Sequence, residues 1–165
     1  MSKKLALGEA LVFAAAVAVS GDLTHFTWWA VVSLVVSDVA VLLECESARA
    51  QVLAATISTC VSVTVLFLSY FECAVFGDAL ESLGPAAYTV GNFALHYWPS
   101  LRLVPRAIGT PVAYIYGDAA CLITLYTSIQ QPANVYRCSK GPPQAAFVAT
   151  SIAGTVFIEA ILSFI

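Results

Sequence analysis

The stretch Tyr88-Thr-Val-Gly-Asn-Phe-Ala-Leu-His-Tyr-Trp-Pro99 decides how this chain must fold, because it places polar side chains inside a long apolar region. On a helix, spacings of three and four residues put Thr89, Asn92 and His96 on one face. An imidazole or an amide without partners is costly in hydrocarbon. That face must therefore look into a helix bundle or a wet cavity. We expect Pro99 to kink or end the helix beside it.

The composition of the chain points to a bilayer as its solvent. Hydrophobic residues make up 60% of the 165 residues, and charged residues make up 10%. Soluble domains average about 45–50% and about 25% of the same classes. The net charge of -3 provides no basic patch, which argues against a nucleic-acid partner and leaves membrane lipid as the expected surrounding.

Polar or turn-rich breaks divide the chain into six apolar segments that approach the roughly 20 residues needed to cross hydrocarbon. We therefore predict an all-α, polytopic membrane protein with six transmembrane helices in one bundle. One domain is expected to cover residues 1–165. The basic residues Lys3 and Lys4 before the first segment imitate a signal peptide, but a first membrane helix is favoured. The predicted spans are 5–20, 25–44, 50–71, 86–104, 108–129 and 144–165.

The distribution of Lys and Arg predicts the orientation of these spans. With six spans, the N-terminus and the loops 44–50 and 100–107 share one side. Five basic residues lie on that side and two on the other, so both termini are predicted to be cytosolic; the organelle is left open. The five are Lys3, Lys4, Arg49, Arg102 and Arg106, and the two are Arg137 and Lys140.

The cysteines suggest one pairing and no metal. Cys73 and Cys138 fall in two loops on the side away from the cytosol, where a disulfide and two free thiols both remain open. No cysteine has metal-ligand spacing with another cysteine or a histidine. We therefore predict neither a metal nor another cofactor.

Acidic side chains interrupt the apolar segments at four positions, Glu9, Asp38, Asp118 and Glu159. Such acids are costly in a membrane unless they are paired, hydrated or protonated, and together with His96 they could form a path for protons or cations. Alternatively, each acid is neutral or hydrogen-bonded to a Tyr or Ser and fixes helix packing. Tyr114 lies four residues before Asp118, which makes a phenol–carboxylate hydrogen bond easy on one helix face. Both interpretations stay open.

A second chemistry combines a hydroxyl with the histidine. Thr27 begins the second span, and His96 could act as its general base. Asn92 could orient the imidazole or donate a hydrogen bond to an oxyanion. Thr89 is a rival hydroxyl on the same helix as the histidine. In straight spans that enter from the same side, Thr27 and His96 would be about 15 Å apart along the bundle, so the pair requires one span to begin at a different depth.

The residues of this pair resemble a known family. The second span starts with Phe26-Thr-Trp-Trp29, the third is rich in Val and Thr, Asn92 and His96 precede Pro99, and a Pro-x-x-Tyr pattern ending at Tyr114 opens the fifth. This order is similar to that of the androgen-induced and rolling-stone-like group of six-span membrane proteins. Its characterised members are threonine hydrolases that cleave fatty-acid esters of hydroxy fatty acids. The resemblance implies Thr27 as nucleophile and His96 as base, with Asn92 and Pro99 as accompanying motif positions.

Three functions from different classes therefore remain open. The first is an intramembrane hydrolase of lipid esters that uses Thr27 and His96. The second is a small transporter or channel for protons, cations or solutes that uses the acids and His96. The third is a non-catalytic subunit of a larger membrane complex, in which polar side chains only dock helices against one another or against other membrane subunits.

Overall fold

The structure, a computed structural model, describes residues 3–21, 25–70, 74–109, 117, 120–122, 124–125 and 152–161. Within this part every regular element is a helix, which confirms the all-α class. A helix covers Ile152–Ile161 near the end of the chain. The earlier elements are α1 (Lys3–Ser20), α2 (Phe26–Leu42), α3 (Ala48–Tyr70), α4 (Ala74–Leu83), α5 (Pro85–Asn92), the π-helical turn η1 (Phe93–Tyr97) and α6 (Trp98–Ala107).

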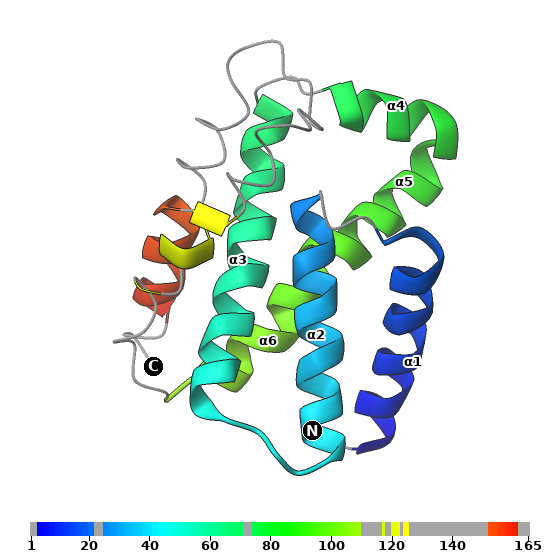
Figure 1. The fold of residues 1–165 in the computed structure, drawn as a ribbon. Helices are drawn as coiled ribbons and strands as arrows, with labels where there is room; N and C mark the ends of the chain where they lie inside the picture. The colour runs from blue at the N-terminus through cyan, green and yellow to red at the C-terminus, as the bar shows by residue number, and fades with distance from the viewer. Residues whose placement is uncertain are drawn as a thin grey trace.

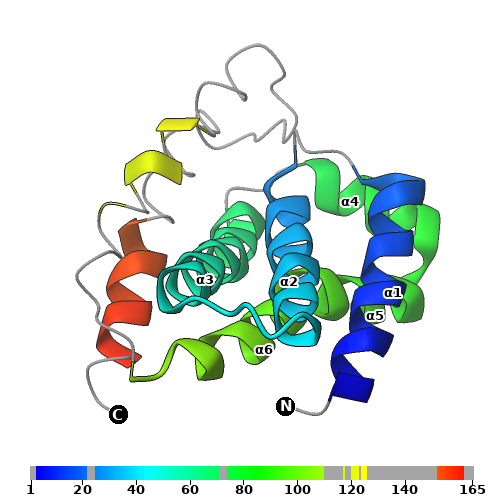
Figure 2. The same cartoon turned by 60° about the horizontal axis from the view of Figure 1, so that its bottom comes forward.

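The first three helices stand side by side, and a fourth helical run crosses behind them. α1, α2 and α3 run alternately up and down in Figure 1. α5, η1 and α6 form a continuous run that passes obliquely behind α2 and α3, as both ribbon views show (Figures 1 and 2). Because of this crossing, α6 contacts both α2 and α3, and η1 does so as well. The crossing decides which residues of distant segments meet.

The core lies where α2, α3 and α6 meet the helix Ile152–Ile161. Small residues are prominent in it, since Ala54, Ala55 and Ala107 are buried beside the larger Leu34 and Leu103. Small side chains allow helix backbones to approach closely. A second close approach of helix backbones lies on the other side of α3. There a Cβ atom added to Gly154 would lie only 2.9 Å from the Cα of Cys60, so a residue without a side chain is needed.

The predicted spans agree with the helices in part. The segments 5–20, 25–44 and 50–71 correspond to α1, α2 and α3. Among the described residues, one helix is long and apolar enough to cross a membrane, at Ala48–Leu66, whereas Phe26–Leu42 and Ile152–Ile161 are shorter apolar helices. Six spans are therefore not supported by the helices seen here. Most of 108–129 and 144–165, like Cys73 and Cys138, lies outside the described residues.

Two segments predicted to be breaks or loops are helices. Residues 76–85, which separate the predicted spans 50–71 and 86–104, are largely α4, because Ala, Leu and Glu there favour helix despite Gly77 and Asp78. The predicted loop 100–107 belongs to α6. Pro99 was expected to kink or end a helix; the helical run continues through it as α6, but the turn before it, Phe93–Tyr97, is π-helical.

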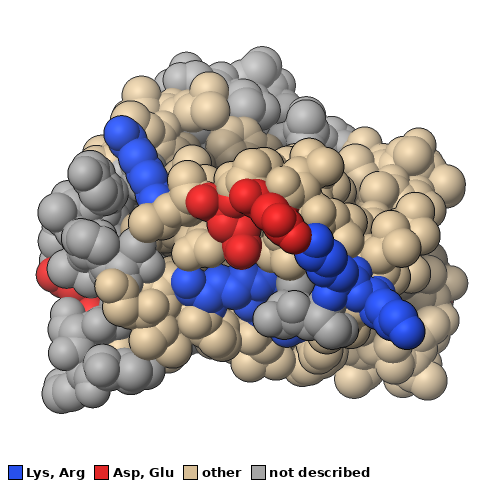
Figure 3. Space-filling view, turned by 90° about the horizontal axis from the view of Figure 1, so that it is seen from below, with Lys and Arg blue, Asp and Glu red and all other residues tan. Residues whose placement is uncertain are grey.

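Charged side chains gather at one end of the bundle. The start of α1, the α2–α3 connection and the end of α6 lie together at the bottom of Figure 1. Viewed from below, Lys, Arg, Asp and Glu side chains occupy this end together (Figure 3). One exposed pair joins Lys3 to Glu44. The end predicted to be cytosolic thus collects bases as expected, and acids are interleaved with them; its orientation in a membrane stays a prediction.

Candidate active site

Thr27 and His96 meet where the crossing run passes the first turn of α2. Thr27 Oγ1 lies 2.7 Å from His96 Nε2, and both side chains are half-buried. The expected offset of about 15 Å between straight spans is therefore wrong. It assumed two straight helices that lie alongside each other over their whole length. Because the run Pro85–Ala107 instead crosses α2 obliquely, a residue in its middle reaches the beginning of α2 (Figures 1 and 2).

The contact of the His96 ring with Asn92 determines which atom donates in the contact with Thr27. His96 Nδ1 lies 3.0 Å from the backbone oxygen of Asn92. A carbonyl oxygen can only accept a hydrogen bond, so Nδ1 carries the proton. In the neutral ring Nε2 then has the free lone pair, and the Thr27 hydroxyl donates to it. This is the arrangement that a general base needs in front of a hydroxyl nucleophile.

Asn92 contributes its backbone to the histidine and leaves its side chain available. Of the two roles left open for this residue, orientation of the ring falls to the main-chain carbonyl. The side-chain Oδ1 is buried and has no hydrogen-bond partner within the described part of the chain. A buried amide oxygen without a partner is unusual and calls for an explanation. The oxyanion role predicted for Asn92 would use the other end of the amide, its –NH₂ group.

The π-helical turn changes which residues share a face. The N–H of Trp98 bonds to the oxygen of Phe93, five residues earlier, so the turn is wider than an α-helical one. The predicted face of Thr89, Asn92 and His96 is not preserved. Thr89 is exposed, and its hydroxyl donates to the oxygen of Pro85 in its own helix. The rival hydroxyl therefore does not reach the imidazole.

One serine that sequence reasoning did not single out contacts the histidine backbone, and a second serine contacts the first. Ser62 of α3 donates its hydroxyl hydrogen to the backbone oxygen of His96, with an O–O distance of 2.5 Å. Ser100 Oγ lies 2.6 Å from Ser62 Oγ. The only signal in the sequence was the richness of the third span in Ser and Thr, which is also typical of ordinary helix packing.

Two of the four acids are held by arginines. Glu9 of α1 accepts from Arg102 at 2.7 Å and 2.8 Å, and from the Trp98 indole at 3.0 Å. Asp38 of α2 is fully buried and accepts from Arg106 at 2.6 Å. Arginines take the place of the Tyr or Ser partners that were expected. Residues 100–107 were predicted from the sequence to form a loop. Arg102 and Arg106 were therefore used only to predict the orientation of the spans, and were not considered as partners of acids inside the bundle.

The remaining acids do not assemble with this site in the described structure. Glu159 lies on the helix Ile152–Ile161, across α3 from α2 (Figures 1 and 2). Asp118 and Tyr114 lie outside the described residues. Where the chain is described, no group of three or more His, Cys, Asp or Glu side chains could hold a metal ion.

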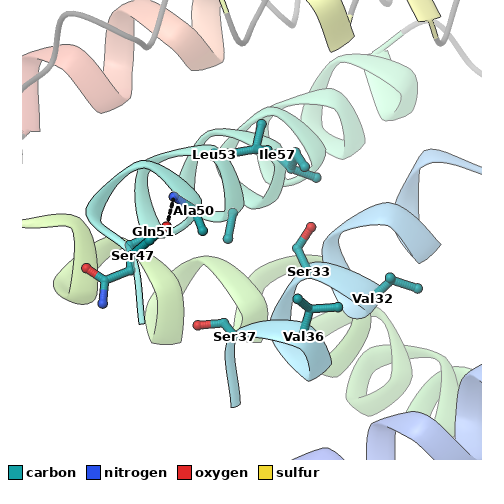
Figure 4. Close-up of a pocket in the computed structure, with 10 residues that line it drawn as sticks. Val32, Ser33, Val36, Ser37, Ser47, Ala50, Gln51, Leu53 and Ile57 are labelled. Carbon is teal, nitrogen blue, oxygen red and sulfur yellow. Dashed lines mark hydrogen bonds between the residues drawn. The ribbon is translucent and has the colours of Figure 1, made fainter. Parts of the chain in front are cut away.

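A groove runs between α2 and α3, on a different part of α2 from Thr27. Figure 4 shows Val32, Ser33, Val36 and Ser37 on the α2 side of it, with Ser33 pointing toward α3. Ser33 and Ser37 lie four residues apart on α2, a spacing typical of small polar packing faces between helices. Ser37 also accepts a hydrogen bond from Arg106 at 2.6 Å. The lining from the α2–α3 connection and α3 consists of Ser47, Ala50, Gln51, Leu53, Ala54 and Ile57.

The fold and the site together define an all-α protein with a hydroxyl–imidazole pair where its helices cross. No protein-family model matches the chain, and no curated protein or solved structure matches it either. What this protein does must therefore be inferred from the chemistry of Thr27, His96 and their neighbours.

Proposed function

We propose that this protein is an integral-membrane hydrolase that cleaves fatty-acid esters, with Thr27 as nucleophile and His96 as general base. One observation carries the proposal: Thr27 Oγ1 lies 2.7 Å from His96 Nε2. The hydrogen bond from Nδ1 to the Asn92 carbonyl turns the lone pair of Nε2 toward that hydroxyl. The resemblance to the androgen-induced and rolling-stone-like hydrolases names the same two residues and suggests fatty-acid esters of hydroxy fatty acids as substrates.

The membrane setting of the proposal is supported by composition and by the outward-facing side chains. Hydrophobic residues form 60% of the chain. Large apolar side chains are exposed on several helices, including Leu11 and Val12 of α1, Val39 of α2 and Leu66 of α3. Lipid would cover such surfaces, and an ester with long acyl chains would reach the site from the same phase. We propose an integral-membrane arrangement with both termini in the cytosol.

The proposed reaction begins when Thr27 Oγ attacks the ester carbonyl carbon while its proton passes to His96 Nε2. The tetrahedral intermediate carries its negative charge on the former carbonyl oxygen. Collapse of the intermediate breaks the bond to the alcohol oxygen, which takes the proton from Nε2, and leaves the acyl group on Thr27. Water then repeats both steps, which releases the fatty acid and restores the threonine hydroxyl.

The Asn92 side chain supplies the remaining requirement of this chemistry. Acyl transfer needs a donor directed at the oxygen that becomes negative in the transition state. In this proposal the Asn92 amide donates to that oxygen. The atom without a partner in the described chain is the amide oxygen Oδ1, which can only accept, so the donor in this proposal is the –NH₂ group of the side chain.

The acids of the bundle support a packing role better than a transport path. Glu9 joins α1 to α6 through Arg102, and Asp38 joins α2 to α6 through Arg106. Each pair links two helices through a guanidinium, which does not deprotonate in proteins. Such pairs hold helices in register, and they suit the scaffold of a hydrolase as well as a non-catalytic subunit.

The test uses the purified full-length protein in lipid nanodiscs and a fluorophosphonate probe, which phosphonylates an activated hydroxyl and releases fluoride. We expect labelling of the wild type and a loss of at least a hundredfold in Thr27→Ala. Thr89→Ala is the matched control, because it removes an exposed hydroxyl bonded only to its own helix. Equal labelling of Thr27→Ala and the wild type would exclude Thr27 as nucleophile. A folded wild type without labelling or esterase activity would favour the non-catalytic subunit.

A further inference from the structure

We propose that Ser62 and Ser100 are positioning residues, which form a chain of two hydroxyl groups that holds the backbone of His96 so that its imidazole faces Thr27. The inference rests on the proposed function, since it assigns these serines a role in the same site. Three contacts carry it: Ser62 Oγ to His96 O at 2.5 Å, Ser62 Oγ to Ser100 Oγ at 2.6 Å, and Ser62 Oγ to Ser58 O at 3.1 Å.

The order of donors in this chain follows from the number of hydrogens. Ser62 has one hydroxyl hydrogen and two carbonyl oxygens within reach. The oxygen of His96 is much closer than that of Ser58, at 2.5 Å against 3.1 Å, so the hydrogen points to His96. Ser100 must then donate its own hydrogen to the Ser62 oxygen. The sequence of donors is therefore Ser100, Ser62 and the His96 carbonyl.

The backbone at His96 needs such support because the regular ladder of hydrogen bonds is incomplete there. Pro99 has no N–H, so the oxygen of Leu95 lacks the donor that an α-helix would supply, and the oxygen of Ala94 lacks its π-helical donor. The turn Phe93–Tyr97 is already widened. The Ser62 hydroxyl of α3 compensates in part, because its hydrogen bond to the His96 carbonyl ties this widened turn to a neighbouring helix.

The position of that carbonyl affects the distance between the reacting atoms. Moving the backbone of His96 moves the whole ring relative to Thr27, which belongs to a different helix. Misplacement by about 1 Å can lower a catalysed rate by a factor on the order of 100. Loss of the Ser62 hydroxyl should therefore affect the Thr–His pair more than it affects folding.

The experiment compares Ser62→Ala with Ser58→Ala in the full-length protein. Ser58 is the matched control, because its buried hydroxyl lies one turn earlier on α3 and donates to the oxygen of Ala55 in the same helix. We expect Ser62→Ala to slow fluorophosphonate labelling by at least tenfold, Ser58→Ala by less than twofold, and Ser62→Thr to recover most of the rate. Ser100→Ala should give an intermediate loss, because Ser62 keeps its own hydrogen.

A spectroscopic measurement separates positioning from catalysis. The chain has two histidines, so imidazole ¹⁵N spectra contain two rings, and His96→Gln assigns the signals. We expect the wild type to show a single tautomer protonated at Nδ1, and Ser62→Ala to show exchange between tautomers. An unchanged His96 spectrum and an unchanged labelling rate in Ser62→Ala would overturn the inference. If the wild type is not labelled but Ser62→Ala alters the ring spectrum, the proposed function fails and the positioning role stands.

Discussion

The Thr27–His96 contact and the Asp38–Arg106 contact join the same two parts of the molecule in opposite chemical ways. Both link α2 to the crossing run, and the members of each pair lie about three helical turns from those of the other pair. The first contact is between groups that can be neutral and exchange a proton. The second contains a guanidinium with a fixed charge. Proton transfer is therefore possible at the Thr27–His96 end of the crossing. The Asp38–Arg106 pair at the other end is the anchor, which only holds the two helices together.

The comparison explains how a half-buried hydroxyl can stay in register with a ring on a different helix. A neutral hydrogen bond contributes only about 1 kcal/mol and does not hold two helices by itself. Glu9 and Asp38 add two arginine pairs further along the same crossing. Since the pairs tie α6 to α1 and α2, the crossing angle is set by charges that take no part in the proposed reaction.

The largest effect is expected from breaking the anchor. Arg106→Ala leaves the carboxylate of Asp38 fully buried without its partner, which should lower the free energy of unfolding by about 3–5 kcal/mol. The double variant Asp38→Leu with Arg106→Met should recover most of this loss. Unfolding in mixed micelles, titrated with a denaturing detergent, measures both.

The exposed pair Lys3–Glu44 provides the control for that prediction. Its side chains are 57% and 74% exposed, so Lys3→Gln should leave stability unchanged within error. If Arg106→Ala were no less stable than Lys3→Gln, the anchor would be an ordinary surface pair and the contrast between the two ends of the crossing would disappear.

The next effect separates the two parts of Asn92. Asn92→Ala removes the side-chain amide and keeps the backbone oxygen that accepts from His96 Nδ1. We expect ester hydrolysis to fall by about 10²–10³-fold, as for the loss of an oxyanion donor. The imidazole spectrum should not change. A changed spectrum with normal hydrolysis would instead mean that the side chain orients the ring.

The helices and the choice of reactive residues were accessible from sequence, whereas their relative depth was not. Apolar segments of suitable length predicted α1, α2 and α3, and the residue types at Thr27 and His96 indicated a nucleophile and a base. Periodicity assumes straight helices, so it missed the π-helical turn and the oblique crossing that bring the pair together. Pro99 and the polar residues after it suggested a loop, which concealed Arg102 and Arg106 as helix residues that pair with acids.

The smallest effect is expected from Thr27→Ser, which keeps the hydroxyl and removes only a methyl group. The β-branched threonine is restricted in χ1, whereas serine samples three staggered positions more evenly. If about a third of the serine side chains direct Oγ toward His96 Nε2, the rate of ester hydrolysis should fall by roughly threefold. The kcat of the two proteins for the same ester measures this, with Thr27→Ala as the zero point. A loss approaching that of Thr27→Ala would mean that the methyl group, and not the hydroxyl, is what the crossing of α2 and η1 requires.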